Sequence, residues 1–144
     1  MVNFRVLCFG DSNTWGCVPG TKFERFSEEV RFPKRLQKIL GNRFEVIEEG
    51  VLGMTLASEY KRKLNSDFKL ADKESRNGSK YILKCLSAHN PVDLVVLILG
   101  TTELKEEFDN SLEKVGKLLE DYYAKVIPKT KSKIDGSCPK LIIV

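Results

Sequence analysis

A chain of 144 residues is long enough for one domain, and we expect residues 1–144 to form one. With 42% hydrophobic and 31% charged residues, its composition is that of a globular protein and excludes disordered, collagen-like and low-complexity chains. The net charge of +4 (24 Lys and Arg against 20 Asp and Glu) comes from scattered basic residues, so we expect a solvated surface and no nucleic-acid partner.

The first third of the chain predicts a strand, a helix and a second strand. Residues 4–9 are apolar and β-prone, which favours a strand. Pro33 suits the first turn of a helix and Gly41 its C-cap, and apolar residues between them recur at helical spacing. Residues 44–48 favour the second strand. The Lys-rich stretch 57–73 predicts a segment that is helical in part.

The rest of the chain continues this alternation. Apolar residues within 82–86 recur at helical spacing and predict a helix that ends before Pro91. Residues 92–99 are apolar on both faces of a strand, as in a central strand of a parallel sheet covered on both sides. Apolar steps of three and four predict an amphipathic helix over 110–127. Residues 141–144 predict one more buried strand.

The sequence predicts neither a membrane partner nor export. The longest apolar run, 94–99, is far below the roughly 20 residues of a membrane-spanning helix, and residues 1–6 do not form a secretory signal. We therefore expect a cytoplasmic protein. The four cysteines and the single histidine lack metal-ligand spacing, so no metal site is expected. Cys8 and Cys85 are expected to be buried thiols without disulfides.

Alternating strands and helices indicate the α/β class with a doubly wound parallel sheet. Ligands of such sheets bind beyond the carboxyl ends of the strands. Three loops should gather there, namely residues 10–20, 50–55 and 100–105. Each follows a predicted strand and carries glycine together with hydroxyl or carboxylate residues. These loops are therefore the predicted functional region.

The first of these loops has three interpretations from its residues alone. A small hydroxyl residue such as Ser12, just past a strand end, suits a nucleophile. The same turn suits a phosphate cradle, although it has neither a Gly-Lys P-loop pair nor a GxGxxG fingerprint. It is also typical of a turn whose Asp11, Ser12 and Asn13 cap local backbone groups. Trp15 and Phe23 either line a pocket or pack over the strand ends.

The exact strings in the three loops resemble the conserved blocks of the GDSL, or SGNH, hydrolases. Residues 9–16 (FGDSNTWG) resemble the first block, residues 46–55 (VIEEGVLGMT) the second, and residues 99–105 (LGTTELK) the third. The blocks appear in the right order, each after a predicted strand. The resemblance implies a three-layer α/β/α, flavodoxin-like fold and a lipase, esterase or acylhydrolase activity on a small ester or acyl substrate.

The resemblance also implies a role for one residue of each block. Ser12 would attack the ester carbonyl, and Gly53 would donate its backbone N–H to the oxyanion. Thr102 stands where the family has an asparagine, and its hydroxyl is a shorter donor than the amide that it replaces. Asp11 would shape the turn. The implied chemistry uses no cofactor.

The family's Asp-x-x-His block, which supplies the catalytic base, is absent from the sequence. The only histidine, His89, precedes the third strand, at the sheet edge opposite Ser12 and roughly 20 Å from it along the strand. A catalytic hydrogen bond needs about 3 Å, so we interpret His89 as structural. We expect Glu48, Glu49 and Glu103 to be solvated carboxylates rather than bases.

We therefore expect a fold that lacks the family's last strand and helix and is incomplete at its C-terminus. Three explanations remain open. The chain is a fragment of a family-like esterase, or it is a degenerate member that acts as a small-molecule binding module, or a second chain supplies the missing strand and histidine. An exposed last strand, residues 141–144, also favours a homo-oligomer that pairs through it.

Overall fold

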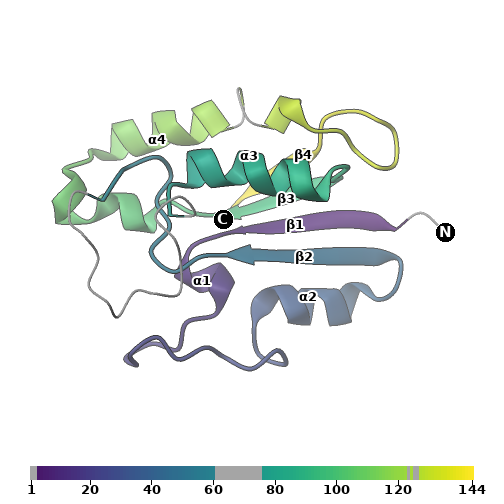
Figure 1. Ribbon diagram of the computed structural model, residues 1–144, viewed down its shortest axis with the longest axis horizontal. Helices are drawn as coiled ribbons and strands as arrows, with labels where there is room; N and C mark the ends of the chain where they lie inside the picture. Colours follow the sequence, from purple (N-terminus) through teal and green to yellow (C-terminus); the bar gives the residue numbers. More distant parts are fainter. Residues whose placement is uncertain (1–2, 61–75, 123, 125–126) are drawn as a thin grey trace.

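Four parallel strands form the sheet of the computed structural model, which describes residues 3–60, 76–122, 124 and 127–144. In spatial order the strands are β2 (Phe44–Gly50), β1 (Phe4–Gly10), β3 (Leu94–Ile98) and β4 (Lys140–Ile143) (Figure 1). Every neighbouring pair is parallel. The predicted α/β class with a parallel sheet is confirmed, and β1, β2 and β3 end at one edge because Gly10 pairs with both Gly50 and Ile98.

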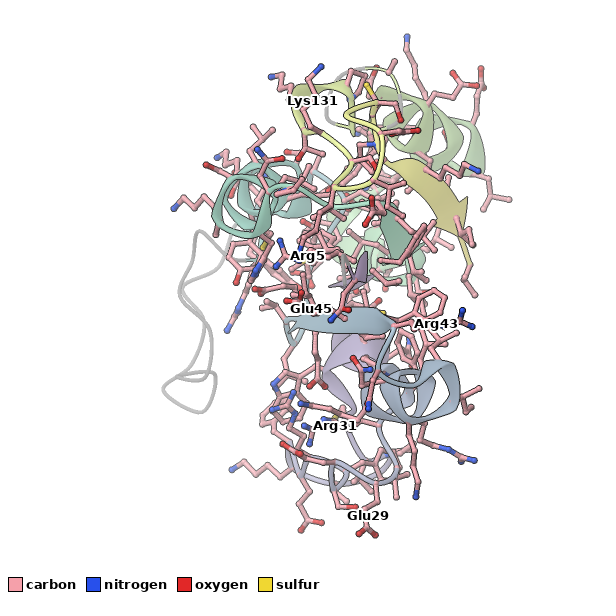
Figure 2. The ribbon with its side chains drawn as sticks, turned by 90° about the vertical axis from the view of Figure 1, so that its right-hand side faces the viewer. Arg5, Glu29, Arg31, Arg43, Glu45 and Lys131 are labelled. Carbon is pink, nitrogen blue, oxygen red and sulfur yellow. The ribbon has the colours of Figure 1, made fainter. Side chains whose placement is uncertain are left out.

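Helices cover both sides of this sheet. The view along the strands shows α2 (Phe32–Leu40) on one side, with α3 (Gly78–His89) and α4 (Leu112–Asp121) on the other (Figure 2). A four-residue helix, α1 (Ser12–Trp15), follows β1 directly. Short 3₁₀ helices among the described residues are η2 (Thr101–Leu104), η3 (Glu106–Phe108) and η5 (Ile127–Lys129). The sheet with helices on both sides is the three-layer arrangement that the resemblance implies.

The main hydrophobic core lies between the sheet and the helices α3 and α4. Alternate residues of β1 and β3 point into it, because side chains alternate between the two faces of a strand. They meet buried residues of α3 and α4. The core includes Leu7, Phe9, Val95, Leu97, Ile82, Cys85, Leu86 and Val115. This core fixes the strands whose carboxyl ends carry the predicted loops.

The predicted helices are confirmed, with one boundary corrected. Helix α2 has a proline at its start and Gly41 as its C-cap, as expected. Helix α3 ends at His89, before Pro91. Helix α4 begins at Leu112, two residues later than the helix predicted over 110–127. Tyr122 and Ala124, after its end at Asp121, are π-helical, and residues 127–129 form η5. The predicted helical stretch 57–73 falls mostly outside the described residues.

The expectation that residues 92–99 form a strand covered on both sides and residues 141–144 a buried strand is met only in part. Alternate residues of β3 are only half-buried. In β4, Ile142 is 49% exposed, and Val144, just after it, is 73% exposed. The helices that pack on the sheet cover one face of β3 and β4, whereas α2 contacts β2 on the other face. The apolar pattern alone does not show which face of a strand receives a helix.

The buried cysteines are as predicted. Cys8 and Cys85 are both buried, and burial raises the pKa of each thiol to about 12. All four cysteines are free thiols in the structure. The two buried thiols therefore pack as small apolar side chains.

We expect this chain to form a dimer through β4. In the described sheet β4 is an edge strand, and its exposed apolar residues and unpaired backbone groups favour pairing with a second chain. Light scattering at micromolar concentration should give the mass of two chains, and replacing Ile142 by lysine should return the mass of one. A wild-type chain with the mass of a monomer would contradict this expectation.

Candidate active site

A pocket of about 370 Å³ lies at the edge of the sheet where β1, β2 and β3 end. Its lining comes from all three loops that were predicted to gather there, with one aromatic residue added. The lining residues are Asp11, Ser12, Asn13, Cys17, Phe23, Leu52, Gly53, Thr101, Thr102 and Lys105. Ser12, Gly53 and Thr102, one residue from each block, thus face one cavity.

Ser12 is the first residue of α1, and Asp11 caps this helix. The Asp11 Oδ1 accepts hydrogen bonds from the Asn13 backbone N–H at 3.0 Å and from its Nδ2 at 3.2 Å. Burial raises the pKa of the Asp11 carboxyl, although the hydrogen bonds from Asn13 and the charge of Lys105 oppose this rise. Asp11 therefore shapes the turn that presents Ser12. Among the described residues, no side chain forms a hydrogen bond with Ser12 Oγ.

The first loop is fixed to both neighbouring strand ends by its backbone. The Gly10 carbonyl accepts a hydrogen bond from Val51 N at 3.0 Å, and Asp11 N donates to Ile98 O at 3.3 Å. The end of β2 also passes very close to α1. A Cβ at Gly50 would lie 2.2 Å from Trp15 N. Glycine is therefore required at position 50, and the backbone of α1 has little freedom to shift.

Gly53 lies in a tight turn of the second loop. Its φ of 69° is in the left-handed region that favours glycine. Met54 N donates to the Val51 carbonyl at 3.2 Å across this turn. The Gly53 carbonyl in turn accepts a hydrogen bond from the Tyr60 hydroxyl at 2.7 Å. The conformation at Gly53 is thus fixed on both sides.

The third loop carries Thr102 and Glu103 in η2, and both side chains are buried. Glu103 Oε1 accepts hydrogen bonds from the backbone N–H groups of Ala57, at 2.6 Å, and Ser58, at 3.0 Å. The expectation that Glu103 is a solvated carboxylate is therefore wrong. The Glu103 carboxylate ties the third loop to the segment that follows the second.

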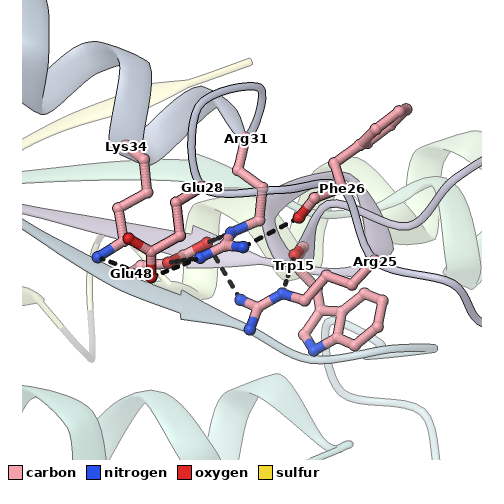
Figure 3. Close-up of polar contacts among 7 residues, drawn as sticks. All are labelled: Trp15, Arg25, Phe26, Glu28, Arg31, Lys34 and Glu48. Carbon is pink, nitrogen blue, oxygen red and sulfur yellow. Dashed lines mark hydrogen bonds and ion pairs between the residues drawn. The ribbon is translucent and has the colours of Figure 1, made fainter.

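Glu48 is also held by partners and is not a solvated carboxylate. Figure 3 shows its carboxylate facing the guanidinium groups of Arg31 and Arg25. Glu48 Oε1 lies 2.7 Å from Arg31 Nε and 3.1 Å from Arg25 Nη2. Arg31 further donates to the Phe26 carbonyl, at 3.0 Å, and Arg25 to the Trp15 carbonyl, at 2.8 Å. This network fastens α1 and the segment after it to β2.

His89 is the last residue of α3, and its imidazole contacts Glu49 rather than Ser12. At the end of α3, its carbonyl accepts a hydrogen bond from Nη1 of Arg5, the second residue of β1. Its Nε2 lies 2.7 Å from Glu49 Oε1, and Tyr81 donates to the other Glu49 oxygen at 2.9 Å. Glu49 is therefore a third carboxylate with partners, contrary to expectation. His89 belongs to this cluster on the α3 side of the sheet.

The pocket lining includes residues other than the predicted nucleophile and oxyanion donors. Phe23 lines the pocket, whereas Trp15 stacks under Arg25, with 4.9 Å between the guanidinium carbon and the ring centroid. Cys17 and Lys105 add a thiol and a cation to the lining. Both lie inside the loops 10–20 and 100–105, but neither is part of the pattern that marks a nucleophile or an oxyanion donor.

Among the residues that the structure describes, no three His, Cys, Asp or Glu side chains gather in a way that suits a metal ion. None of the described helices is long and apolar enough to cross a membrane.

Several solved structures with a similar fold are esterases. The chain is 32% identical to the native aryl esterase of M. smegmatis, with a TM-score of 0.80, and the match covers 97% of this chain and 62% of that one. For the carbohydrate acetylesterase Est24 from Sinorhizobium meliloti the identity is 27% and the TM-score 0.80, over 98% of this chain and 63% of that one. For a carbohydrate acetylesterase family member from the same organism the identity is 32% and the TM-score 0.80. That match covers 97% of this chain and 61% of the other.

The chain therefore spans about 62% of the length of the structures that it matches. No protein-family profile matches the sequence, and no curated protein matches it.

Proposed function

We propose that this chain, whose fold matches that of an aryl esterase and a carbohydrate acetylesterase, is a serine carboxylic ester hydrolase of the GDSL/SGNH type with Ser12 as its nucleophile. The substrate class is small carboxylic esters or acyl groups, and the site is expected to need neither metal nor cofactor. The observation that supports this proposal is the convergence of Ser12, Gly53 and Thr102 on one pocket at the carboxyl edge of a parallel sheet. A cytoplasmic location is part of the same proposal.

The proposed reaction is acyl transfer to Ser12. Its Oγ forms a bond to the ester carbonyl carbon, and the carbonyl π electrons move to the oxygen. The N–H groups of Ser12 and Gly53 stabilise this oxyanion, with the Thr102 hydroxyl as the third donor. The tetrahedral intermediate then expels the alcohol, and water releases the acyl group as a carboxylic acid. The shorter reach of Thr102 predicts a weaker third donor than the family's asparagine.

The proton of Ser12 must pass to a base, and no described residue is hydrogen-bonded to Ser12 Oγ. This observation favours the alternative function, a catalytically degenerate or truncated member that binds a small molecule in the same pocket. Further residues of a longer protein, or a second chain, are the two proposed sources of a base. A thermal-shift panel of nucleotides, flavins and short carboxylates tests the binding function, which stabilisation by one of these compounds would favour.

The test of the esterase proposal is covalent labelling by a fluorophosphonate. Attack of Ser12 Oγ on phosphorus expels fluoride, so the labelled chain gains the mass of the phosphonyl group less that of one proton. We expect the label on Ser12 by peptide mapping, none in Ser12→Ala, and full labelling in Ser137→Ala, which removes an exposed loop serine. A folded wild-type chain that stays unlabelled would contradict the proposed activity.

A further inference from the structure

Tyr60 connects the second loop to the third through contacts at both ends of its side chain. Its hydroxyl donates to the Gly53 carbonyl at 2.7 Å. Its ring meets Phe108 of η3 edge-on, with 5.0 Å between the ring centroids and an interplanar angle of 74°. The Lys105 ammonium, from the pocket lining, lies 5.9 Å from the Tyr60 ring centroid. One side chain thus contacts the segments that present Gly53 and Thr102.

The ring of Tyr60 is held firmly enough to aim its hydroxyl. A second cation, the Arg76 guanidinium, lies 5.8 Å from the ring centroid, and cations over an aromatic ring are attracted by its electron-rich face. Nearby, Glu103 binds the backbone of Ala57 and Ser58, so the segment that leads to Tyr60 is itself anchored. Burial raises the pKa of the Tyr60 hydroxyl to about 12, and the hydroxyl therefore remains a donor at neutral pH.

We propose that Tyr60 is a positioning residue that holds the Gly53 N–H toward the oxyanion site. This inference rests on the proposed function of the pocket. Gly53 has no Cβ and sits at a positive φ, so nothing in its own side chain restricts rotation of the two peptide groups that flank it. The hydrogen bond from Tyr60 fixes the peptide on one side of Gly53 and thereby limits the pivoting of the other. Tyr60 itself does not line the pocket.

The test compares Tyr60→Phe with Tyr81→Phe. Both variants lose only a hydroxyl, and the Tyr81 hydroxyl binds Glu49 on the α3 side of the sheet. In Tyr60→Phe the amide resonance of Gly53 should shift and its proton should exchange faster with solvent. Labelling of Ser12 by the fluorophosphonate should slow by about three- to tenfold, as expected for the loss of one hydrogen bond. In Tyr81→Phe neither measurement should change.

The Gly53 resonance and the labelling rate test different parts of the proposal. A Gly53 resonance and exchange rate that are unchanged in Tyr60→Phe would overturn the positioning role. So would a shifted resonance with an unchanged labelling rate, because the tether would then be structural only. A wild-type chain that is not labelled contradicts the proposed function, whereas the Gly53 resonance still decides whether Tyr60 holds this peptide. Thermal midpoints of all three proteins confirm that the variants are folded.

Discussion

Replacing Gly50 by alanine is expected to slow the labelling of Ser12 by about 100-fold. The new Cβ would lie 2.2 Å from Trp15 N and 2.6 Å from both the Thr14 carbonyl carbon and Trp15 Cα. These are backbone atoms of α1, so no side-chain rotation relieves the overlap. Either α1 or the end of β2 must move, and Ser12 moves with α1. A displacement of about 1 Å near a reacting group lowers rates by roughly 10²-fold.

The matched control for Gly50→Ala is Gly116→Ala. Gly116 lies in α4, and a Cβ there would meet nothing within 4 Å. Alanine is the better helix former by about 1 kcal/mol, so this variant should unfold at a slightly higher temperature and label Ser12 at the wild-type rate. A wild-type labelling rate in a folded Gly50→Ala chain would show that the contact between β2 and α1 does not set the position of Ser12.

The place of the site could be predicted from the sequence because it depends on a property of the whole sheet. Once 4–9, 44–48 and 92–99 are identified as parallel strands, their carboxyl ends must lie at one edge. The loops that follow these strands therefore lie close together, and this does not depend on how the helices pack. The pocket lined by Ser12 and Gly53 confirms this reasoning. The resemblance of the loop sequences to the family's blocks identified the individual site residues.

The partners of the carboxylates could not be predicted in this way. A glutamate in a strand or turn is usually solvated, and its sequence neighbours do not reveal a distant donor. Glu48 binds Arg31, 17 residues earlier, and Glu103 binds the backbone of Ala57, 46 residues earlier. Such pairs depend on how loops fold over the sheet. The contacts of Tyr60 could not be predicted either, because the stretch that contains it is only polar and Lys-rich in sequence.

Which faces of the sheet are covered by helices could not be predicted, for a related reason. Residues 141–144 and 92–99 are equally apolar, and apolar runs favour burial on both faces. The structure buries Val95 and Leu97 under α3 and α4 but leaves Ile142 about half exposed. Burial of a strand face depends on where the next helix lies, and that is a property of topology rather than of the strand itself.

Glu48→Gln is expected to lower the free energy of unfolding by about 3 kcal/mol. Arg31 is 7% exposed and Glu48 13%, so both charges are largely removed from water. Arg25 also pairs with Glu48, and the exposed Glu28 lies 3.5 Å from Arg31 (Figure 3). Breaking such a pair on one side leaves a buried charge without compensation, which typically costs about 3–5 kcal/mol. We place the loss at the lower end, because Arg31 retains its hydrogen bond to the Phe26 carbonyl and its ion pair with the exposed Glu28. Urea denaturation followed by circular dichroism measures it.

Glu45→Gln is the control that isolates burial as the cause. Glu45 lies on the same strand and also pairs with one arginine through two hydrogen bonds, at 2.9 and 3.0 Å. That pair is more exposed, 15% for Arg5 and 45% for Glu45, so water screens it and the expected loss is at most about 1 kcal/mol. Equal losses in the two variants would show that burial does not set the strength of the Glu48 network. A larger loss in Glu48→Gln, together with slower labelling of Ser12, would show that this network also holds α1 in place.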